Sequence, residues 1–307
     1  MQTKNLPKGI FPIIQTPFDR KGELDFVSLQ NLIEDAIAAG CDGLICTGVA
    51  GEIGYLTEEE RLKLLSFVFK TVDSRVPIIV GASSDDVEIS RKLIQWSQDH
   101  GGVACLIQVP SIHYKNQDSI VPYFRQMTDG FSSPIVVQDF ELNGSGMSLD
   151  IITRLVSEIP TISGIKIETL PSGPKYTAVK KALGNDFYVS GGWAVTQLIE
   201  ALERGVDAMI PECAMVRLYK KIFLLYQNGN EDKAKVLFYK MLPILSFTNQ
   251  EVGNSIKFFK CLLVEKGIFS TAKMRWTEPE WDNYSHQTAR NLIHLYLSLE
   301  AELDGSE

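Results

Sequence analysis

A lysine interrupts an apolar segment near the middle of the chain. In the segment TISGIKIETLPSG, Lys166 lies between Ile165 and Ile167. If residues 162–168 form a strand, the two isoleucines point to one face, while Lys166 and Glu168 point to the other. Burial disfavours the charged form of an amine, and a neutral amine attacks ketones to form a Schiff base. Two interpretations remain at this point: a nucleophilic lysine, or a structural ion pair between Lys166 and Glu168.

A glycine-containing turn is the second candidate for chemistry. Residues 46–61 read CTGVAGEIGYLTEEER and follow another apolar segment. Glycines at 48 and 51 let a backbone approach a ligand closely, and consecutive N–H groups of Gly48, Val49, Ala50 and Gly51 are able to bind a carboxylate. An ordinary connecting loop would explain the same glycines.

Further candidates surround these two. Glu168 is suited to assist Lys166 as a base, or it caps the end of a strand. Gly191 and Gly192 follow an apolar segment without a nearby lysine or arginine, which favours contact with an organic acid over phosphate. His113 is either an acid–base group or a solvated bystander. No residues show metal-ligand spacing, so we expect no metal site.

The elements that must position these residues form a repeating pattern. Eight apolar runs of strand length each precede a helical stretch, and their nearly continuous apolar character is typical of parallel strands covered on both faces. No G-x-G-x-x-G motif follows the first run, so the pattern predicts an α/β protein with a (β/α)8 barrel rather than an open sheet. The runs are 9–18, 42–48, 76–83, 103–110, 134–140, 162–168, 187–192 and 206–211.

Helix boundaries support this division of the chain. Thr57 and Glu60 form a predicted capping box at the start of one helix. Gly40, Gly101 and Gly205 each stand where a helix ends shortly before an apolar run, as expected of glycine after a helix C-terminus. In such a barrel Lys166 points inward near the carboxyl end of the sixth strand, the end at which these barrels carry out chemistry.

The strand pattern ends after residue 211, and helices are expected at 212–228, 230–247, 251–266 and 284–302. We therefore predict two domains, a catalytic barrel at 1–229 and a C-terminal helical domain at 230–307. The segment QNGNED supplies a break between them.

Composition limits the partners. The chain has 307 residues, 45% of them hydrophobic, and a formal charge of −8, which gives no basic surface for nucleic acid or an anionic membrane. It has neither a signal-peptide pattern nor an apolar run long enough to cross a bilayer, so we expect a cytoplasmic protein acting on a small molecule. Its five scattered cysteines are expected to be reduced thiols.

The segments GIFPIIQTPF, GVAGEIGYLTEEER, GIKIE and SGG, in this order, resemble the family of dihydrodipicolinate synthase and N-acetylneuraminate lyase. The resemblance covers nearly the whole chain. It implies a barrel lyase that acts on pyruvate or another 2-keto acid through a Schiff base on Lys166, with no added cofactor. It also implies a homo-oligomer, a tetramer or a dimer.

The chain departs from the family pattern around the lysine. Val49 and Ala50 stand where the aldolases of the family have hydroxyl side chains, which leaves only backbone amides to bind a carboxylate. Gln138 stands in place of the tyrosine that serves as acid and base, and Ile112 in place of a second relay tyrosine. Tyr114, two residues further on, is a weak substitute for the latter.

The segments IVVQDF and GIKIETL are similar to those of the L-2-keto-3-deoxyarabonate dehydratases within this family. The resemblance implies a dehydratase of a 2-keto-3-deoxy sugar acid, with Lys166, Gln138 and Glu168 as catalytic residues and an amide that orients a water. Two alternatives stay open: a pyruvate-dependent aldolase, to which the GVAGE turn is closer, and a family member that binds keto acids without catalysis.

Overall fold

Eight parallel strands form the centre of the molecule. The computed structural model describes residues 6–141, 144–193 and 196–304. The strands are β1 (Gly9–Ile10), β2 (Leu44–Cys46), β3 (Ile78–Gly81), β4 (Ala104–Gln108), β5 (Ile135–Asp139), β6 (Ile162–Ile167), β7 (Tyr188–Gly191) and β8 (Ala208–Met209). Their order is β1-β8-β7-β6-β5-β4-β3-β2, and a parallel bridge between Ile13 and Ile45 joins its two ends. The strands therefore close into the predicted (β/α)8 barrel.

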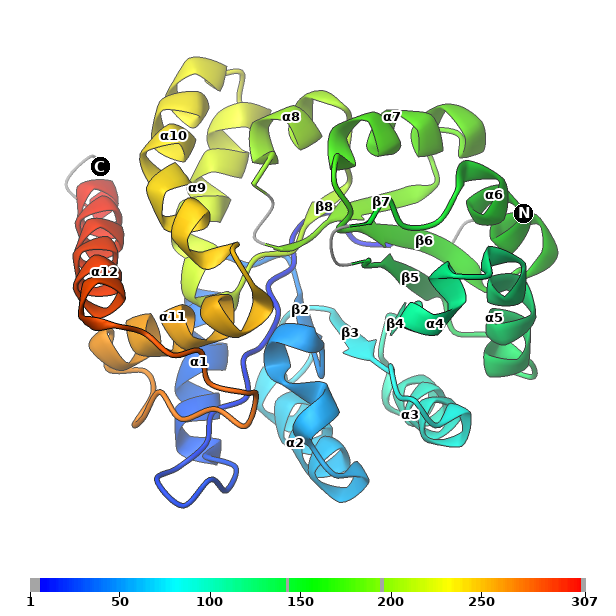
Figure 1. The fold of residues 1–307 in the computed structure, drawn as a ribbon, viewed down its shortest axis with the longest axis horizontal. Helices are drawn as coiled ribbons and strands as arrows, with labels where there is room; N and C mark the ends of the chain where they lie inside the picture. Colours follow the sequence, from blue (N-terminus) through cyan, green and yellow to red (C-terminus); the bar gives the residue numbers. More distant parts are fainter. Residues whose placement is uncertain (1–5, 142–143, 194–195, 305–307) are drawn as a thin grey trace.

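Helices surround the strands (Figure 1). Those of the barrel are α1 (Phe26–Ala38), α2 (Glu58–Val72), α3 (Val87–His100), α4 (Ser111–Tyr114), α5 (Ile120–Thr128), α6 (Leu149–Glu158), α7 (Ser172–Leu183), α8 (Leu198–Glu203) and α9 (Val216–Gln227). The capping box of Thr57 and Glu60 is present at the start of α2, and Gly40, Gly101 and Gly205 all have positive φ after their helices. These predictions of helix boundaries are confirmed.

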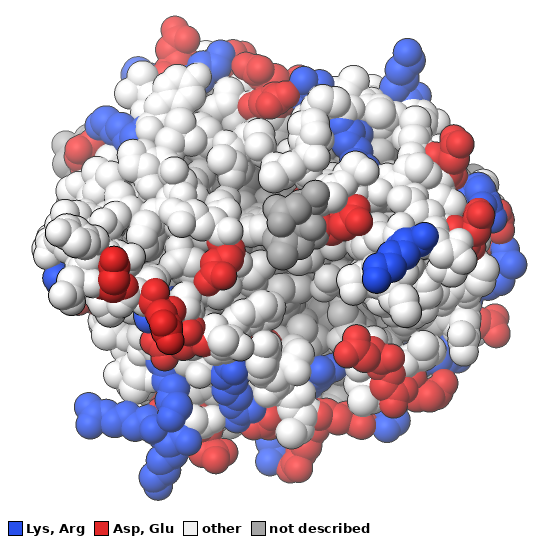
Figure 2. Space-filling view, viewed as in Figure 1, with Lys and Arg blue, Asp and Glu red and all other residues white. Residues whose placement is uncertain are grey.

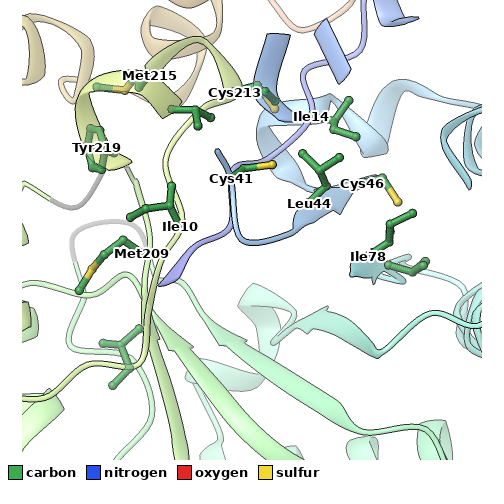
Figure 3. Close-up of a cluster of buried hydrophobic side chains, with 14 of the residues drawn as sticks. Ile10, Ile14, Cys41, Leu44, Cys46, Ile78, Met209, Cys213, Met215 and Tyr219 are labelled. Atoms are coloured by element: carbon green, nitrogen blue, oxygen red, sulfur yellow. The ribbon is translucent and has the colours of Figure 1, made fainter. Parts of the chain in front are cut away.

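The barrel has one hydrophobic cluster inside it and a larger one between strands and helices. Ile45 and Ile79 belong to the inner cluster, whereas Leu44, Cys46 and Ile78 belong to the outer one. Figure 3 shows part of the outer cluster, where side chains of β1, β2, β3 and β8 meet residues such as Met215 and Tyr219. This alternation follows from the two-residue period of a strand.

The C-terminal segment is helical, as predicted. It consists of α10 (Glu231–Thr248), α11 (Val252–Glu265) and α12 (Asn283–Asp304), which lie together on one side of the barrel (Figure 1). The phenol of Tyr296 on α12 donates a 2.7 Å hydrogen bond to the carbonyl of Ala214. The division into domains 1–229 and 230–307 stays a prediction, and the ends of both, 1–5 and 305–307, lie outside the described residues.

A buried ion pair fixes α11 and the segment after it to the turn that follows β2. The ammonium of Lys260 contacts the carboxylate of Glu52, and both side chains are fully buried. The other carboxylate oxygen of Glu52 accepts hydrogen bonds of 2.6 and 2.7 Å from the backbone N–H groups of Arg275 and Trp276. The C-terminal region thus holds the glycine-containing turn in place.

The surface carries charges of both signs. Figure 2 shows basic and acidic side chains interspersed around the margin of one face, with uncharged residues over much of its centre. Among the described residues, no helix is both long and apolar enough to span a membrane. The five cysteines are free thiols.

Candidate active site

Lys166 lies inside the barrel near the carboxyl end of β6. Its side chain is 1% exposed, and its Nζ lies 3.0 Å from Oε1 of Glu168. Ile165 and Ile167 belong to the outer hydrophobic cluster. The predicted facing of this strand is therefore confirmed, and the structure brings the lysine and the glutamate into one ion pair.

Gln138 joins this pair from the neighbouring strand. It is in register with Lys166 in the pairing of β5 with β6. Its side-chain Nε2 donates a 2.5 Å hydrogen bond to Oε2 of Glu168. One carboxylate oxygen of Glu168 thus faces the ammonium group, and the other faces the amide. Such an arrangement holds the carboxylate between a proton donor and an orienting group.

A cavity opens over these three side chains. Val49 and Ala50 form part of its wall, and Trp193 and Phe140 form another part with their rings in edge-to-face contact. Trp193 thus forms part of the cavity wall. Among the described residues, the lining is Ile13, Val49, Ala50, Gln138, Phe140, Lys166, Glu168, Trp193, Ile210, Pro211, Glu212, Val252 and Ser255.

The glycine-containing turn presents two residues to the cavity. Val49–Gly51 forms a single 3₁₀ turn with Gly48 at its N-terminal cap. The first N–H groups of such a turn, those of Val49 and Ala50, have no partner within it. The N–H of Gly51 instead donates to the carbonyl of Gly48 at 3.0 Å, and a Cβ on Gly51 would lie 2.8 Å from the carbonyl oxygen of Ile14. Gly51 thus serves packing, and Gly48 caps the turn.

The two glycines after β7 differ in their surroundings. Gly191 lies within β7, paired with Ile167 and Met209. Gly192 lies against the catalytic candidates, because a Cβ there would approach Oε1 of Glu168 to 2.2 Å and Cε of Lys166 to 2.3 Å. Only glycine leaves these two side chains where they are.

Glu212 is a cavity residue that the sequence analysis did not identify. It follows β8 and is 6% exposed, and its Oε1 accepts a 3.2 Å hydrogen bond from the hydroxyl of Ser255 on α11. Burial raises the pKa of Glu212 to about 8, although the hydroxyl of Ser255 and the ammonium groups of Lys166 and Lys260 act in the opposite direction. Its only sequence signal is an acidic residue directly after the last apolar run, in IPECA.

Three other candidates lie outside the cavity. The phenol of Tyr114 donates a 3.1 Å hydrogen bond to Asp139, whose side chain does not line the cavity, and Ile112 is 70% exposed. Nδ1 of His113 lies 2.6 Å from the hydroxyl of Ser119. The structure therefore does not bring Tyr114 or His113 to Lys166. Within the described parts of the chain, no group of three or more His, Cys, Asp or Glu side chains has an arrangement that could hold a metal ion.

Comparisons with known proteins identify the family of the chain. A model of the "Dihydrodipicolinate synthetase family" matches residues 6–290. The chain belongs to this family. As a member of the dihydrodipicolinate synthetase family, it is a lyase, which confirms the predicted family and enzyme class.

The chain is similar to relatives with two different activities, a dehydratase and a synthase. It is 27% identical to an L-2-keto-3-deoxyarabonate dehydratase of Azospirillum brasilense over 89% of each chain. It is 29% identical to a 4-hydroxy-tetrahydrodipicolinate synthase of Bacillus subtilis (strain 168), over 75% of this chain and 80% of the synthase.

Solved structures of the family have the same fold. The crystal structure of dihydrodipicolinate synthase from Rhodopseudomonas palustris superposes with a TM-score of 0.86 at 25% identity, over 95% of this chain and 98% of that one. The sialic acid aldolase of Ruminococcus gnavus reaches the same TM-score at 19% identity, over 96% and 98% of the two chains. At that identity the likeness concerns the fold alone.

Proposed function

We propose that this lyase forms a Schiff base between Lys166 and the ketone of a 2-keto acid, and that it removes water from a 2-keto-3-deoxy sugar acid of the L-2-keto-3-deoxyarabonate type. The observation that carries the proposal is the buried set of Lys166, Glu168 and Gln138 over one cavity. It holds an amine nucleophile and a carboxylate base, and it contains no phenol.

The substrate carboxylate binds to the backbone of the turn after β2. The N–H groups of Val49 and Ala50 are the first of the 3₁₀ turn and have no partner within it, and both residues line the cavity. Gly48, at the N-terminal cap of this turn, has no side chain that would cover these N–H groups. This placement leaves the ketone carbon of the substrate to face Lys166 across the barrel.

Glu168 moves protons between the lysine and the substrate. At 3.0 Å, it accepts a proton from the ammonium of Lys166, which leaves a neutral amine to attack the C2 ketone. Returning this proton to the C2 oxygen releases water and leaves a protonated imine. The carboxylate of Glu168 then removes a proton from C3, and the electron pair passes into the imine. The hydroxyl at C4 leaves next, with formation of a C3–C4 double bond.

Two observations favour a dehydratase. Gln138 holds Glu168 by its amide and cannot shuttle protons as a phenol does, and Tyr114 bonds to Asp139 instead of reaching the cavity. The Azospirillum dehydratase is similar along 89% of the chain. Loss of water needs no group to protonate a newly formed carbon or aldehyde, so it does not depend on the missing phenol.

A pyruvate-dependent aldolase is the second candidate. The GVAGE turn is closer to the aldolase pattern, and the synthase of Bacillus subtilis is as similar in identity as the dehydratase.

We further propose that the protein needs no added cofactor, assembles into a homo-oligomer and acts in the cytoplasm.

Borohydride trapping tests the proposal. The protein is incubated with borohydride and pyruvate, 2-keto-3-deoxyarabonate or 2-keto-3-deoxygluconate, and the modified residue is mapped by mass spectrometry. We expect a reduced adduct on Lys166. The internal controls are Lys180 and Lys260, which are also buried but pair with Asp207 and Glu52; they should stay unmodified.

The products separate the candidates. A keto acid that has lost one water identifies a dehydratase, whereas released pyruvate identifies an aldolase. If no keto acid of the panel gives an adduct on Lys166, the Schiff-base mechanism is wrong.

A further inference from the structure

Glu212 has a free oxygen inside the cavity of Lys166. Its Oε1 accepts the hydrogen bond from Ser255, but its Oε2 is buried and has no hydrogen-bond partner among the described residues. A buried polar atom without a partner costs free energy, on the order of 1–3 kcal/mol. A buried oxygen without a hydrogen-bond partner on the wall of a cavity indicates that it contacts a molecule bound in the cavity.

The cavity over Lys166 also reaches Glu212. β7 separates β8 from β6 in the barrel, and Gly192, directly after β7, abuts Lys166 and Glu168. Lys166 and Glu212 line one cavity, so a substrate bound to Lys166 occupies a space that Glu212 also borders. Both acids line the same cavity, Glu168 directly after β6 and Glu212 shortly after β8.

Glu212 carries a proton at neutral pH. The groups that act on it are Lys166, Glu168, Cys213, Tyr219, Ser255 and Lys260. Burial outweighs the ammonium groups among them and raises the pKa of Glu212 to about 8. Below this pH Glu212 is a neutral acid with a proton to donate, and above it the proton is lost. A neutral acid near its working pH is suited to general acid catalysis.

We propose that Glu212 is the acid that protonates the hydroxyl leaving C4 of the substrate. This inference rests on the proposed dehydratase function. Glu168 takes the proton from C3, the electrons of the enamine form the C3–C4 double bond, and the C4–O bond breaks. The departing oxygen takes the proton of Glu212 and leaves as water. Glu212 becomes a carboxylate, and the proton held by Glu168 returns to it through solvent for the next turnover.

The assignment defines the class of substrate. A 2-keto acid with a C4 hydroxyl directed toward β8 reacts, whereas pyruvate, which has no C4, forms the imine but has no hydroxyl to lose. Ser255 acts through Glu212 as a positioning residue, because its hydroxyl orients the carboxyl group and lowers the pKa of Glu212.

The test compares Glu212→Gln with the wild type in two assays. The amide fills the same volume but cannot supply a proton. We expect borohydride trapping of pyruvate on Lys166 to stay within about twofold of wild type, while kcat for dehydration of 2-keto-3-deoxyarabonate falls by about 100-fold or more. The matched control is Glu300→Gln, another buried glutamate, which pairs with Lys266; neither residue lines the cavity. It should leave both assays unchanged.

A pH profile supplies the independent measurement. In the wild type, kcat should fall as the pH rises above about 8, and this decline should be absent from Glu212→Gln. Ser255→Ala removes the hydrogen bond that lowers the pKa of Glu212, so its decline should move to higher pH while trapping persists.

The outcomes distinguish this inference from the proposed function. If the wild type dehydrates the substrate and Glu212→Gln does so at the same rate, the role of Glu212 is wrong and the proposed function stands. Loss of trapping in Glu212→Gln, with a melting temperature equal to that of Glu300→Gln, also overturns the role, because the residue then acts before dehydration. If the wild type traps no keto acid, or releases pyruvate, the proposed function itself fails and the inference falls with it.

Discussion

The substitution Gly192→Ala perturbs the proposed catalytic pair without changing any chemical group in it. A Cβ at this position would lie 2.2 Å from Oε1 of Glu168 and 2.3 Å from Cε of Lys166, whereas real Cβ contacts keep at least 3.0 Å. Glu168 and Lys166 must therefore each move by about 0.7 to 0.8 Å, in a core that is closely packed. A misplacement of about 1 Å is able to cost about 100-fold in rate. Overpacking also destabilises proteins by about 1–3 kcal/mol.

We therefore expect Gly192→Ala to reduce the rate of imine formation with pyruvate by about 10- to 100-fold, measured by borohydride trapping over time. Thermal unfolding followed by circular dichroism should show a modest loss of stability. The control is Gly54→Ala, because a Cβ at Gly54 meets nothing within 4 Å and its backbone is not in the left-handed region. If Gly192→Ala traps pyruvate as fast as Gly54→Ala does, the position of the pair does not limit the chemistry, and our account of the site is wrong.

Two further predictions concern stability. The pKa of Glu60 is lowered to about 2 by its hydrogen bonds from Arg275, so this pair stabilises the fold above pH 4.5 and loses its effect as the pH falls toward 2. Wild type should melt at a higher temperature than Glu60→Gln at pH 7, and the two curves should converge near pH 2; a constant difference would contradict this. Lys260→Met leaves the buried carboxylate of Glu52 without its cation, and urea unfolding should show a loss of about 3–5 kcal/mol. A loss below about 1 kcal/mol would mean that the backbone N–H groups of Arg275 and Trp276 satisfy Glu52 by themselves.

Local patterns in the sequence predicted the frame of the site correctly. The apolar runs predicted the strands, and the alternation of faces placed Lys166 and Glu168 on the inner face of β6. Both rules act over a few residues and need no tertiary information. The same is true of the capping box at Thr57, whose two hydrogen bonds lie within one helical turn.

Contacts between distant segments could not be predicted in this way. Ser255 reaches Glu212 across 43 residues, and Lys260 reaches Glu52 across 208. The periodicity of α11 predicts a helix, but it does not show which strand ends this helix covers. The burial of Glu212 could therefore not be predicted from the sequence. A distant contact also explains the glycine at position 51, because a Cβ there would lie 2.8 Å from the carbonyl oxygen of Ile14. The part of Gly51 in substrate binding stays a prediction.

The pairing of Glu52 with Lys260 has a consequence for how the protein is made. Glu52 is synthesised long before Lys260, so the carboxylate of Glu52 has no counterion until the last quarter of the chain is being made. A premature stop codon anywhere between residues 229 and 260 would leave all eight strands but remove Lys260, and a stop before residue 256 would remove Ser255 as well. We expect such truncated products to be degraded rather than to persist as smaller enzymes. The barrel and the C-terminal helices should therefore function only when they are translated as one chain.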